Sequence, residues 1–261
     1  MMQRDLGFFK GVAIAARHAL PATSPATLQR DALNLSSVWK RTPGTKGASE
    51  VEDRATFAVS WLELREKDPV RALDPNTLTI SLASVRNQTP ALKVARAAAL
   101  AADQRFDNDS LALLFGGAQT GLSVVKPGFS EKLLRSDLDN IKAIVPSFEE
   151  ICANTGVSYD GVAELIAHEY VTFRLGNPGA ALRFVSGGFG TGGRFGWLDV
   201  NTDPTPADVF VDGSMMGTSP VTQLVATAGS HSVKGEKGGL KAQVTATVPA
   251  VQRISVDLKL A

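Results

Sequence analysis

The spacing of apolar residues predicts helices along much of the first two thirds of the chain. Residues 91–104 are rich in alanine and carry leucine and valine at positions that form one apolar face of a helix. Thr89 and Pro90 stand just before this stretch, as an N-cap and a first-turn proline do. Three further helices are expected at residues 55–66, 109–114 and 130–144. Gly116 and Gly117 are expected to end the second of these.

Alternation of apolar and polar residues predicts strands at other positions. Residues 77–85 alternate almost cleanly and predict one short strand within the helical region. Residues 241–248 and 251–260 alternate in the same way, as half-buried strands do. Asp212-Gly213 is typical of a tight hairpin turn, because both residues tolerate a positive φ. The C-terminal part is therefore expected to be a β-structure.

These patterns divide the chain of 261 residues into four parts and predict an α+β fold. The expected parts are a basic, partly extended arm (1–48), a mainly helical domain (49–186), a glycine-rich hinge (187–195) and a small antiparallel β-sandwich (196–261). Hydrophobic residues make up 44% of the chain and charged residues 20%, so it can bury a core.

The N-terminal arm differs from the rest in charge. Residues 1–46 hold seven Lys or Arg and two Asp, a local excess of 7 − 2 = +5, although the whole chain carries only +1. We expect a solvated arm, or one that docks onto an acidic partner, a neighbouring subunit or a membrane surface. Residues 6–16 are mildly apolar, but Lys10 interrupts them. A short amphipathic helix that packs or docks is therefore preferred to a cleaved secretory signal.

Residues 110–125 contain no charged side chain, which raises the question of a membrane span. The stretch has sixteen residues and includes Gly116, Gly117 and Gly121. It is too short and too rich in glycine for a good span, so a buried helix and turn are expected instead.

Residues 147–168 resemble a helix-turn-helix in their spacing. Ser147 stands three residues before Glu150, as in a capping box, and Gly156 takes the turn. Five acidic residues from 149 to 169 face the single Arg174, a balance of 1 − 5 = −4 that would repel phosphate. We therefore expect a structural helical hairpin and no nucleic-acid partner. Cys152, the single cysteine of the chain, is expected to be a small core residue.

The sequence templates for catalysis and ligand binding are not matched. His168-Glu169 begins like a zinc-protease helix, but Thr172 stands where the second histidine would be needed. Gly188, Gly190 and Gly193 have the spacing of a dinucleotide fingerprint, yet strand-like residues follow where a helix is required. We expect no enzyme activity, no catalytic residue, no cofactor and no metal site.

The C-terminal part resembles a known family. The elements that carry the resemblance are Leu198 and Val200, Pro204-Thr-Pro-Ala207, Val209-Phe-Val-Asp212-Gly213, Gly217-Thr-Ser-Pro220 and Ala228-Gly-Ser-His-Ser-Val233. Together they are similar to the PEGA domain over residues 195–261, whereas the N-terminal region resembles no family. Pro206 replaces the turn glycine of the signature, and Ser219 replaces its threonine. The resemblance implies an immunoglobulin-like or transthyretin-like sandwich, often attached to surface, envelope or secreted proteins.

These observations favour a non-enzymatic structural or interaction protein of a surface or multi-subunit assembly. The resemblance implies contacts with proteins or the cell wall, and we expect self-association or a larger assembly. The candidate contact residues are Trp197, Phe210, Met215 and Met216. The alternatives are a virion component, a carbohydrate or cell-wall binding module, and a DNA-binding regulator that the acidic charge disfavours. The resemblance favours the cell envelope or surface, with a virion or a cytoplasmic assembly as alternatives, and no membrane span is expected.

Overall fold

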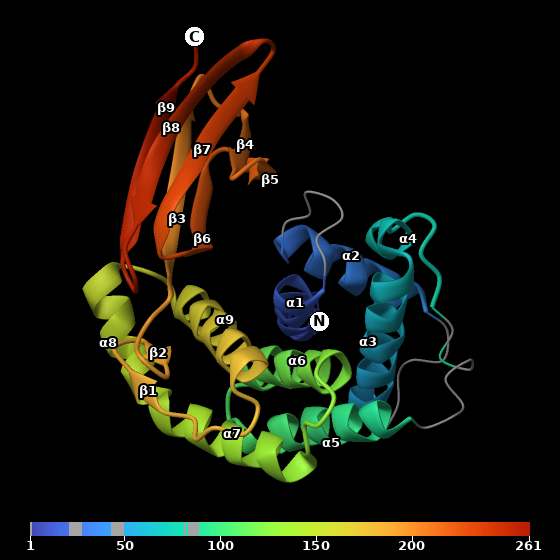
Figure 1. The fold of residues 1–261 in the computed structure, drawn as a ribbon. Helices are drawn as coiled ribbons and strands as arrows, with labels where there is room; N and C mark the ends of the chain where they lie inside the picture. Colours follow the sequence, from blue (N-terminus) through green and yellow to red (C-terminus); the bar gives the residue numbers. More distant parts are fainter. Residues whose placement is uncertain (1, 21–27, 43–49, 81, 83–88) are drawn as a thin grey trace. The chain divides into compact units, whose positions relative to one another are not determined.

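Figure 1 shows the computed structural model, which describes residues 2–20, 28–42, 50–80, 82 and 89–261. The chain forms two compact units. The helical unit contains the described residues up to 143 together with residues 170–182, and the C-terminal unit contains residues 144–169 and 183–261. The helical hairpin of residues 147–168 thus belongs with the β-structure, whereas the sequence had placed it in the helical domain.

The described part of the chain has the following helices: α1 (Met2–Ala19), α2 (Leu28–Arg41), α3 (Glu50–Lys67), α4 (Pro69–Leu73), α5 (Pro90–Arg105), α6 (Asp109–Val125), α7 (Glu131–Ile144), α8 (Pro146–Thr155) and α9 (Tyr159–Gly176). The expected helices at 55–66, 91–104 and 130–144 are confirmed as α3, α5 and α7. Thr89 caps α5 by accepting a hydrogen bond from the Leu92 amide, with Pro90 in the first turn.

The first two helices correct the prediction of a partly extended arm. In α1, Phe8, Phe9 and Val12 are buried, and in α2 Leu35 and Trp39 are buried in the same core cluster. The helix expected at 6–16 is confirmed as part of the longer α1, but residues 11–16 are all buried, so it is not amphipathic as expected. In α2, by contrast, the buried side chains share one face. Burial of the apolar surface of both helices outweighs the local positive charge. Lys46 and the side chain of Arg4 lie outside the described residues.

Helix α6 continues through the glycines that were expected to end it. A Cβ atom on Gly117 would lie 1.9 Å from the carbonyl oxygen of Phe8, and one on Gly121 would lie 2.4 Å from the Ala15 Cβ. On the facing helix, a Cβ on Gly11 would lie 2.0 Å from the Leu114 oxygen. The glycines therefore let the backbones of α1 and α6 touch, and this packing offsets their poor helix propensity.

A fully buried ion pair joins α7 to α9 within the helical unit. The Arg174 guanidinium donates to both oxygens of Asp137, at 2.8 and 2.5 Å, and both side chains are 1% exposed. Tyr170 donates its hydroxyl to the same carboxylate at 2.8 Å. Burial raises the pKa of Asp137, while the Arg174 and Tyr170 contacts oppose that rise.

The strand expected at residues 77–85 is not formed in its described part. The Asp74 carboxylate accepts hydrogen bonds from the Asn76 amide and the Thr77 hydroxyl, which holds a turn. Leu78 and Ile80 are buried in the core of the helical unit. The apolar residues of the alternating pattern are thus buried in the core, although the segment that carries them is irregular and not a strand. Residues 81 and 83–85 lie outside the described part.

The strands of the C-terminal unit are β1 (Phe184–Val185), β2 (Gly188–Phe189), β3 (Phe195–Asp203), β4 (Asp208–Val211), β5 (Ser214–Thr218), β6 (Val221–Thr227), β7 (Gly229–Lys237), β8 (Leu240–Val248) and β9 (Arg253–Lys259). Apart from the β1–β2 pair, they form sheets of order β6-β3-β9 and β5-β4-β7-β8. The two sheets share one apolar core that includes Leu198, Val209, Val233 and Leu258. Figure 1 shows these strands beside each other.

One pairing corrects the prediction of a wholly antiparallel structure. Strand β9 lies parallel to β3, with Trp197 opposite Arg253 and Asp203 opposite Lys259. After β3 the chain crosses to the four-stranded sheet as β4 and β5 and returns as β6, antiparallel to β3. It then crosses again as β7 and β8 and returns as β9, parallel to β3. The remaining pairings in both sheets are antiparallel.

The glycine-rich segment lies inside the C-terminal unit rather than between two domains. Positions for Cβ atoms on Gly187 and Gly193 are 2.5 and 2.4 Å from the Val251 side chain. Strand β3 follows this segment, as expected, so no helix N-terminus is present there for a dinucleotide phosphate. The segment expected to be a hinge is therefore closely packed on the turn before β9.

Candidate functional site

Trp197, the first of the four candidate contact residues, is not on the surface. Its side chain is completely buried, and its Nε1 donates to the carbonyl oxygen of Gly161 at 3.1 Å. An indole on β3 thereby anchors the start of helix α9. The prediction that Trp197 contacts a partner is wrong, because no part of the ring is accessible.

Two further contacts attach the α8–α9 turn to the sheet. Arg253 donates to the carbonyl oxygen of Gly156 at 2.8 Å and forms an ion pair with Asp199 at 2.8 Å. The Gln223 side-chain oxygen accepts from both the amide and the hydroxyl of Ser158, at 3.1 and 2.6 Å. The N-terminus of α9, which would read bases in a helix-turn-helix, is thus engaged within the chain.

The helical hairpin itself differs from the prediction in detail. Gly156 takes the turn with φ 65°, as expected. The capping box is wrong: α8 begins at Pro146 with Val145 as N-cap, so Ser147 already lies within the helix. Proline sets the first turn and removes the need for a side-chain cap at Ser147. Cys152 is only partly buried rather than a core residue.

Glu169 fixes the start of β3 and does not face an open site. Its side chain is completely buried, and Oε1 accepts hydrogen bonds from the amides of Arg194 and Phe195. Burial raises the pKa of Glu169, while the Arg194 contacts oppose that rise. The neighbouring His168 ring packs on Phe195, with centroids 5.3 Å apart. The pair that began like a zinc-binding sequence therefore holds β3 against α9.

The outer face of the four-stranded sheet brings two candidate residues together. Phe210 on β4 lies directly opposite Met215 on β5, and both are partly exposed. The Lys234 ammonium lies 4.5 Å from the centroid of the Phe210 ring and 2.9 Å from Glu236. Met216 points to the opposite face and packs against the core, because successive residues of a strand alternate between faces.

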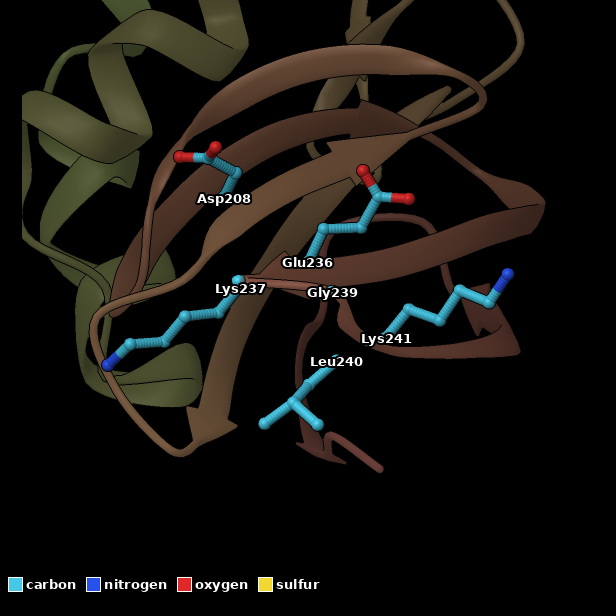
Figure 2. A pocket seen from close by; sticks show the side chains of 7 residues that line it. Asp208, Glu236, Lys237, Gly239, Leu240 and Lys241 are labelled. Carbon is cyan, nitrogen blue, oxygen red and sulfur yellow. The ribbon is translucent and has the colours of Figure 1, made fainter.

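A shallow hollow of about 360 Å³ lies at the end of the same sheet, around the β7–β8 turn. Asp208 and Glu236 are cross-strand neighbours at its edge. Figure 2 shows that Lys237 and Lys241 extend away from each other, so the charged groups do not converge on one point. Lys237 also donates to the carbonyl oxygen of Thr205 at 3.1 Å. The hollow offers charge but no assembled set of ligands.

His231 and Asp212 join two turns at the other end of this sheet. The His231 Nδ1 lies 2.7 Å from the Asp212 carboxylate, and Nε2 lies 2.7 Å from the carbonyl oxygen of Thr227. Asp212 also accepts a hydrogen bond from the Ser232 amide at 2.9 Å. The imidazole therefore connects the β4–β5 turn with the end of β6.

Comparison with known families agrees with this β-structure. The family model described as PEGA domain matches residues 195–261. The C-terminal region is a PEGA domain. No family matches the residues before it, and no curated protein or solved structure matches the chain.

Within the PEGA domain, the signature residues have visible structural roles. Asp212 and Gly213 take positive φ angles of 51° and 77° in the β4–β5 turn. The Ser219 hydroxyl accepts from the Ala207 amide at 2.9 Å and lies 2.5 Å from the Thr202 hydroxyl. Serine thus supplies the hydroxyl that threonine supplies in the family signature. Gln223 and Arg253 were not singled out from the sequence, since their partners lie on distant elements.

Two features of the described residues bear on metal binding and on membranes. Within those ranges, no three His, Cys, Asp or Glu side chains gather as a metal site would. Among the described helices, none combines the length and the apolar character that crossing a bilayer requires. Of the four candidate contact residues, Phe210 and Met215 lie opposite each other and are partly exposed, so they form the candidate contact site.

Proposed function

We propose that this chain is a non-enzymatic structural or interaction protein of a surface or multi-subunit assembly. In this proposal its PEGA domain presents a contact surface, which we define as Phe210, Met215 and Lys234 on the outer face of the four-stranded sheet. The observation that carries it is the pairing of Phe210 with Met215 on an open sheet face. A partly exposed aromatic residue beside a methionine resembles the composition of protein interfaces, in which aromatic residues and methionine are enriched.

A protein partner fits this surface better than a carbohydrate. Sugar-binding aromatics present an open ring face, but the Phe210 ring carries the Lys234 ammonium over it. Trp197, the other aromatic considered for a glycan, is buried. A cation over a ring can remain in a protein interface and pair there with an acidic side chain.

Two features of the structure argue against a DNA partner. The N-terminus of α9 is engaged by Gln223 and Trp197 from the same chain. The exposed side chains nearby include Glu149, Glu150 and Asp160, which would repel phosphate. We therefore place the function in protein contacts and self-association, with an envelope or cell-surface setting favoured by the family.

Sedimentation velocity and light scattering on the full chain test self-association through this surface. Deleting residues 1–47 would not be informative, because it removes the buried helices α1 and α2. The test variant is Phe210→Thr with Met215→Thr, since threonine keeps the β propensity. The control is Leu240→Thr with Val244→Thr, which removes apolar side chains that are 41% and 40% exposed in the same sheet.

We expect the average mass of the wild-type chain to rise with concentration. We expect the test pair to raise the dissociation constant at least ~10-fold, which corresponds to ~1.4 kcal/mol. The control pair should leave the dissociation constant unchanged. A wild-type chain that stays monomeric at all concentrations, or equal losses in both pairs, would contradict the proposal.

A further inference from the structure

The hydrogen bonds of His231 require a particular protonation state. Its side chain is 9% exposed, with Nδ1 2.7 Å from Asp212 Oδ2 and Nε2 2.7 Å from the Thr227 carbonyl oxygen. A carbonyl oxygen and an ionised carboxylate can only accept hydrogen bonds. A neutral imidazole has one N–H group and can satisfy only one of them. The imidazolium, with two N–H groups, satisfies both.

Among the groups around His231, one negative charge balances the positive charge of the imidazolium. Asp212, in the β4–β5 turn, is the charged residue in contact with the ring among the described residues. From β6, Thr227 contributes its carbonyl oxygen and a neutral hydroxyl that lies 3.4 Å from Nε2. From β8, the cross-strand neighbour is Ala246. The pair is therefore a single imidazolium–carboxylate contact at the end of the sheet.

We infer that His231 is a pH-sensitive latch. As an imidazolium it ties the Asp212-Gly213 turn to the end of β6, and loss of its proton releases one of the two ties. The Thr227 hydroxyl, 3.4 Å from Nε2, is too far away to replace the lost bond well. The inference concerns the turn itself and does not depend on whether the proposed contact surface binds a partner.

The backbone of the Asp212-Gly213 turn is strained, so the hydrogen bonds of Asp212 help to hold it. Asp212 takes a φ of 51°, in the left-handed region that side chains other than glycine adopt at a cost. Its carboxylate is held by the His231 ring and by the Ser232 amide. Phe210 and Met215 are each separated from the Asp212-Gly213 turn by one residue and pair across the hairpin. Release of the Asp212-Gly213 turn from the end of β6 is therefore expected to loosen the backbone that positions both residues.

The pKa directions agree with this geometry. Burial opposes the charge on His231, but the Asp212 and Thr227 hydrogen bonds and the Asp212 charge outweigh it and raise the His231 pKa. For Asp212, burial acts against ionisation, but the His231 and Ser232 contacts outweigh it and lower the pKa. His231 thus stabilises the fold below its unfolded pKa of about 6.5, and this contribution is lost as pH rises through the folded pKa. The Asp212 contribution is lost instead as pH falls through its own lowered pKa.

Nuclear magnetic resonance titration of the histidine side chains in the full chain tests the latch. The signal of His231 is assigned by its loss in His231→Gln. The test variant is Asp212→Asn, which keeps the size of the side chain and removes its charge. Asp257→Asn is the matched control, because Asp257 is also an exposed carboxylate of the PEGA domain but contacts Asn201 instead.

We expect His231 in the wild-type chain to titrate above 6.5, with both ring nitrogens protonated below that midpoint. Asp212→Asn should lower the midpoint, and Asp257→Asn should leave it unchanged. In the wild type, amide exchange at Ser232 should accelerate above the same midpoint by more than the intrinsic, base-catalysed rise of exchange with pH. A His231 pKa at or below 6.5, no change in Asp212→Asn, or an exchange rate at Ser232 that shows no step at the midpoint would overturn the inference. Because the wild-type titration and exchange need no variant, a poorly folded Asp212→Asn chain leaves the latch testable.

Discussion

Replacing Gly117 by alanine tests whether α1 and α6 pack backbone against backbone. The new Cβ would lie 1.9 Å from the Phe8 carbonyl oxygen and 2.8 Å from its carbon. Rotation of a side chain cannot relieve a clash with backbone atoms, so the helices must move apart. Overpacking of this kind costs ~3 kcal/mol at the upper end of the usual range. Alanine regains ~1 kcal/mol as a better helix former, so the expected net loss is ~2 kcal/mol.

Thermal and urea unfolding of the full chain, followed by circular dichroism at the helix band, measure this loss. At ~2–4 °C per kcal/mol for a chain of this size, the midpoint should fall by ~4–8 °C. The matched control is Gly176→Ala at the end of α9, where no atom lies within 4 Å of the added Cβ. That variant should be unchanged or more stable by up to ~1 kcal/mol. A Gly117→Ala chain as stable as the wild type would refute the close packing of α1 on α6.

Three further predictions concern buried groups. Arg174→Met should destabilise the chain by ~3–5 kcal/mol in urea unfolding at pH 7, because Asp137 is left buried without its partner, and adding Asp137→Asn should recover part of the loss; a loss below ~1 kcal/mol would contradict the buried pair. Burial raises the pKa of Asp31 from 3.8 to about 6 and outweighs the opposing charges of Arg30, Arg65 and Arg17. Ionisation of Asp31 therefore opposes folding as pH rises through that interval. Asp31→Asn should therefore stabilise the chain at pH 8 by up to ~3 kcal/mol, with the gain shrinking from pH 6 downward, and a pH-independent effect would argue against a shifted Asp31. Trp197→Phe should cost ~1–3 kcal/mol in urea unfolding, because the Gly161 carbonyl loses its donor, whereas a surface position would be insensitive to the change.

The elements that sequence reasoning predicted well are those whose signals are local. Helix α5 has a threonine cap, a first-turn proline and an apolar face within one short stretch, so its start was predictable to the residue. Strands β8 and β9 alternate clearly, and the PEGA signature lies in consecutive turns. In each case the information sits within a few neighbouring residues.

The elements that were missed depend on contacts between distant segments. The glycines in α6 predicted the end of a helix, because the helix α1 that packs against them lies about a hundred residues earlier in the chain. Trp197 reads as an exposed aromatic until its hydrogen bond to Gly161 is known. Met215 and Met216 read as one apolar pair, although the strand sends them to opposite faces. The contacts of Gln223 and Arg253 with the α8–α9 turn have no local signal in the sequence.

Hydroxyl-radical footprinting can show whether the PEGA domain contacts protein partners through Phe210 and Met215. The full chain is oxidised at concentrations below and above its association midpoint, and the modification rate of each side chain is read by mass spectrometry. We expect Phe210 and Met215 to be modified at least ~3-fold more slowly in the associated state, because burial in an interface shields side chains from the radical. Leu240, exposed in the same sheet, should react at the same rate in both states. Unchanged rates at Phe210 and Met215 in an associated sample would contradict this contact.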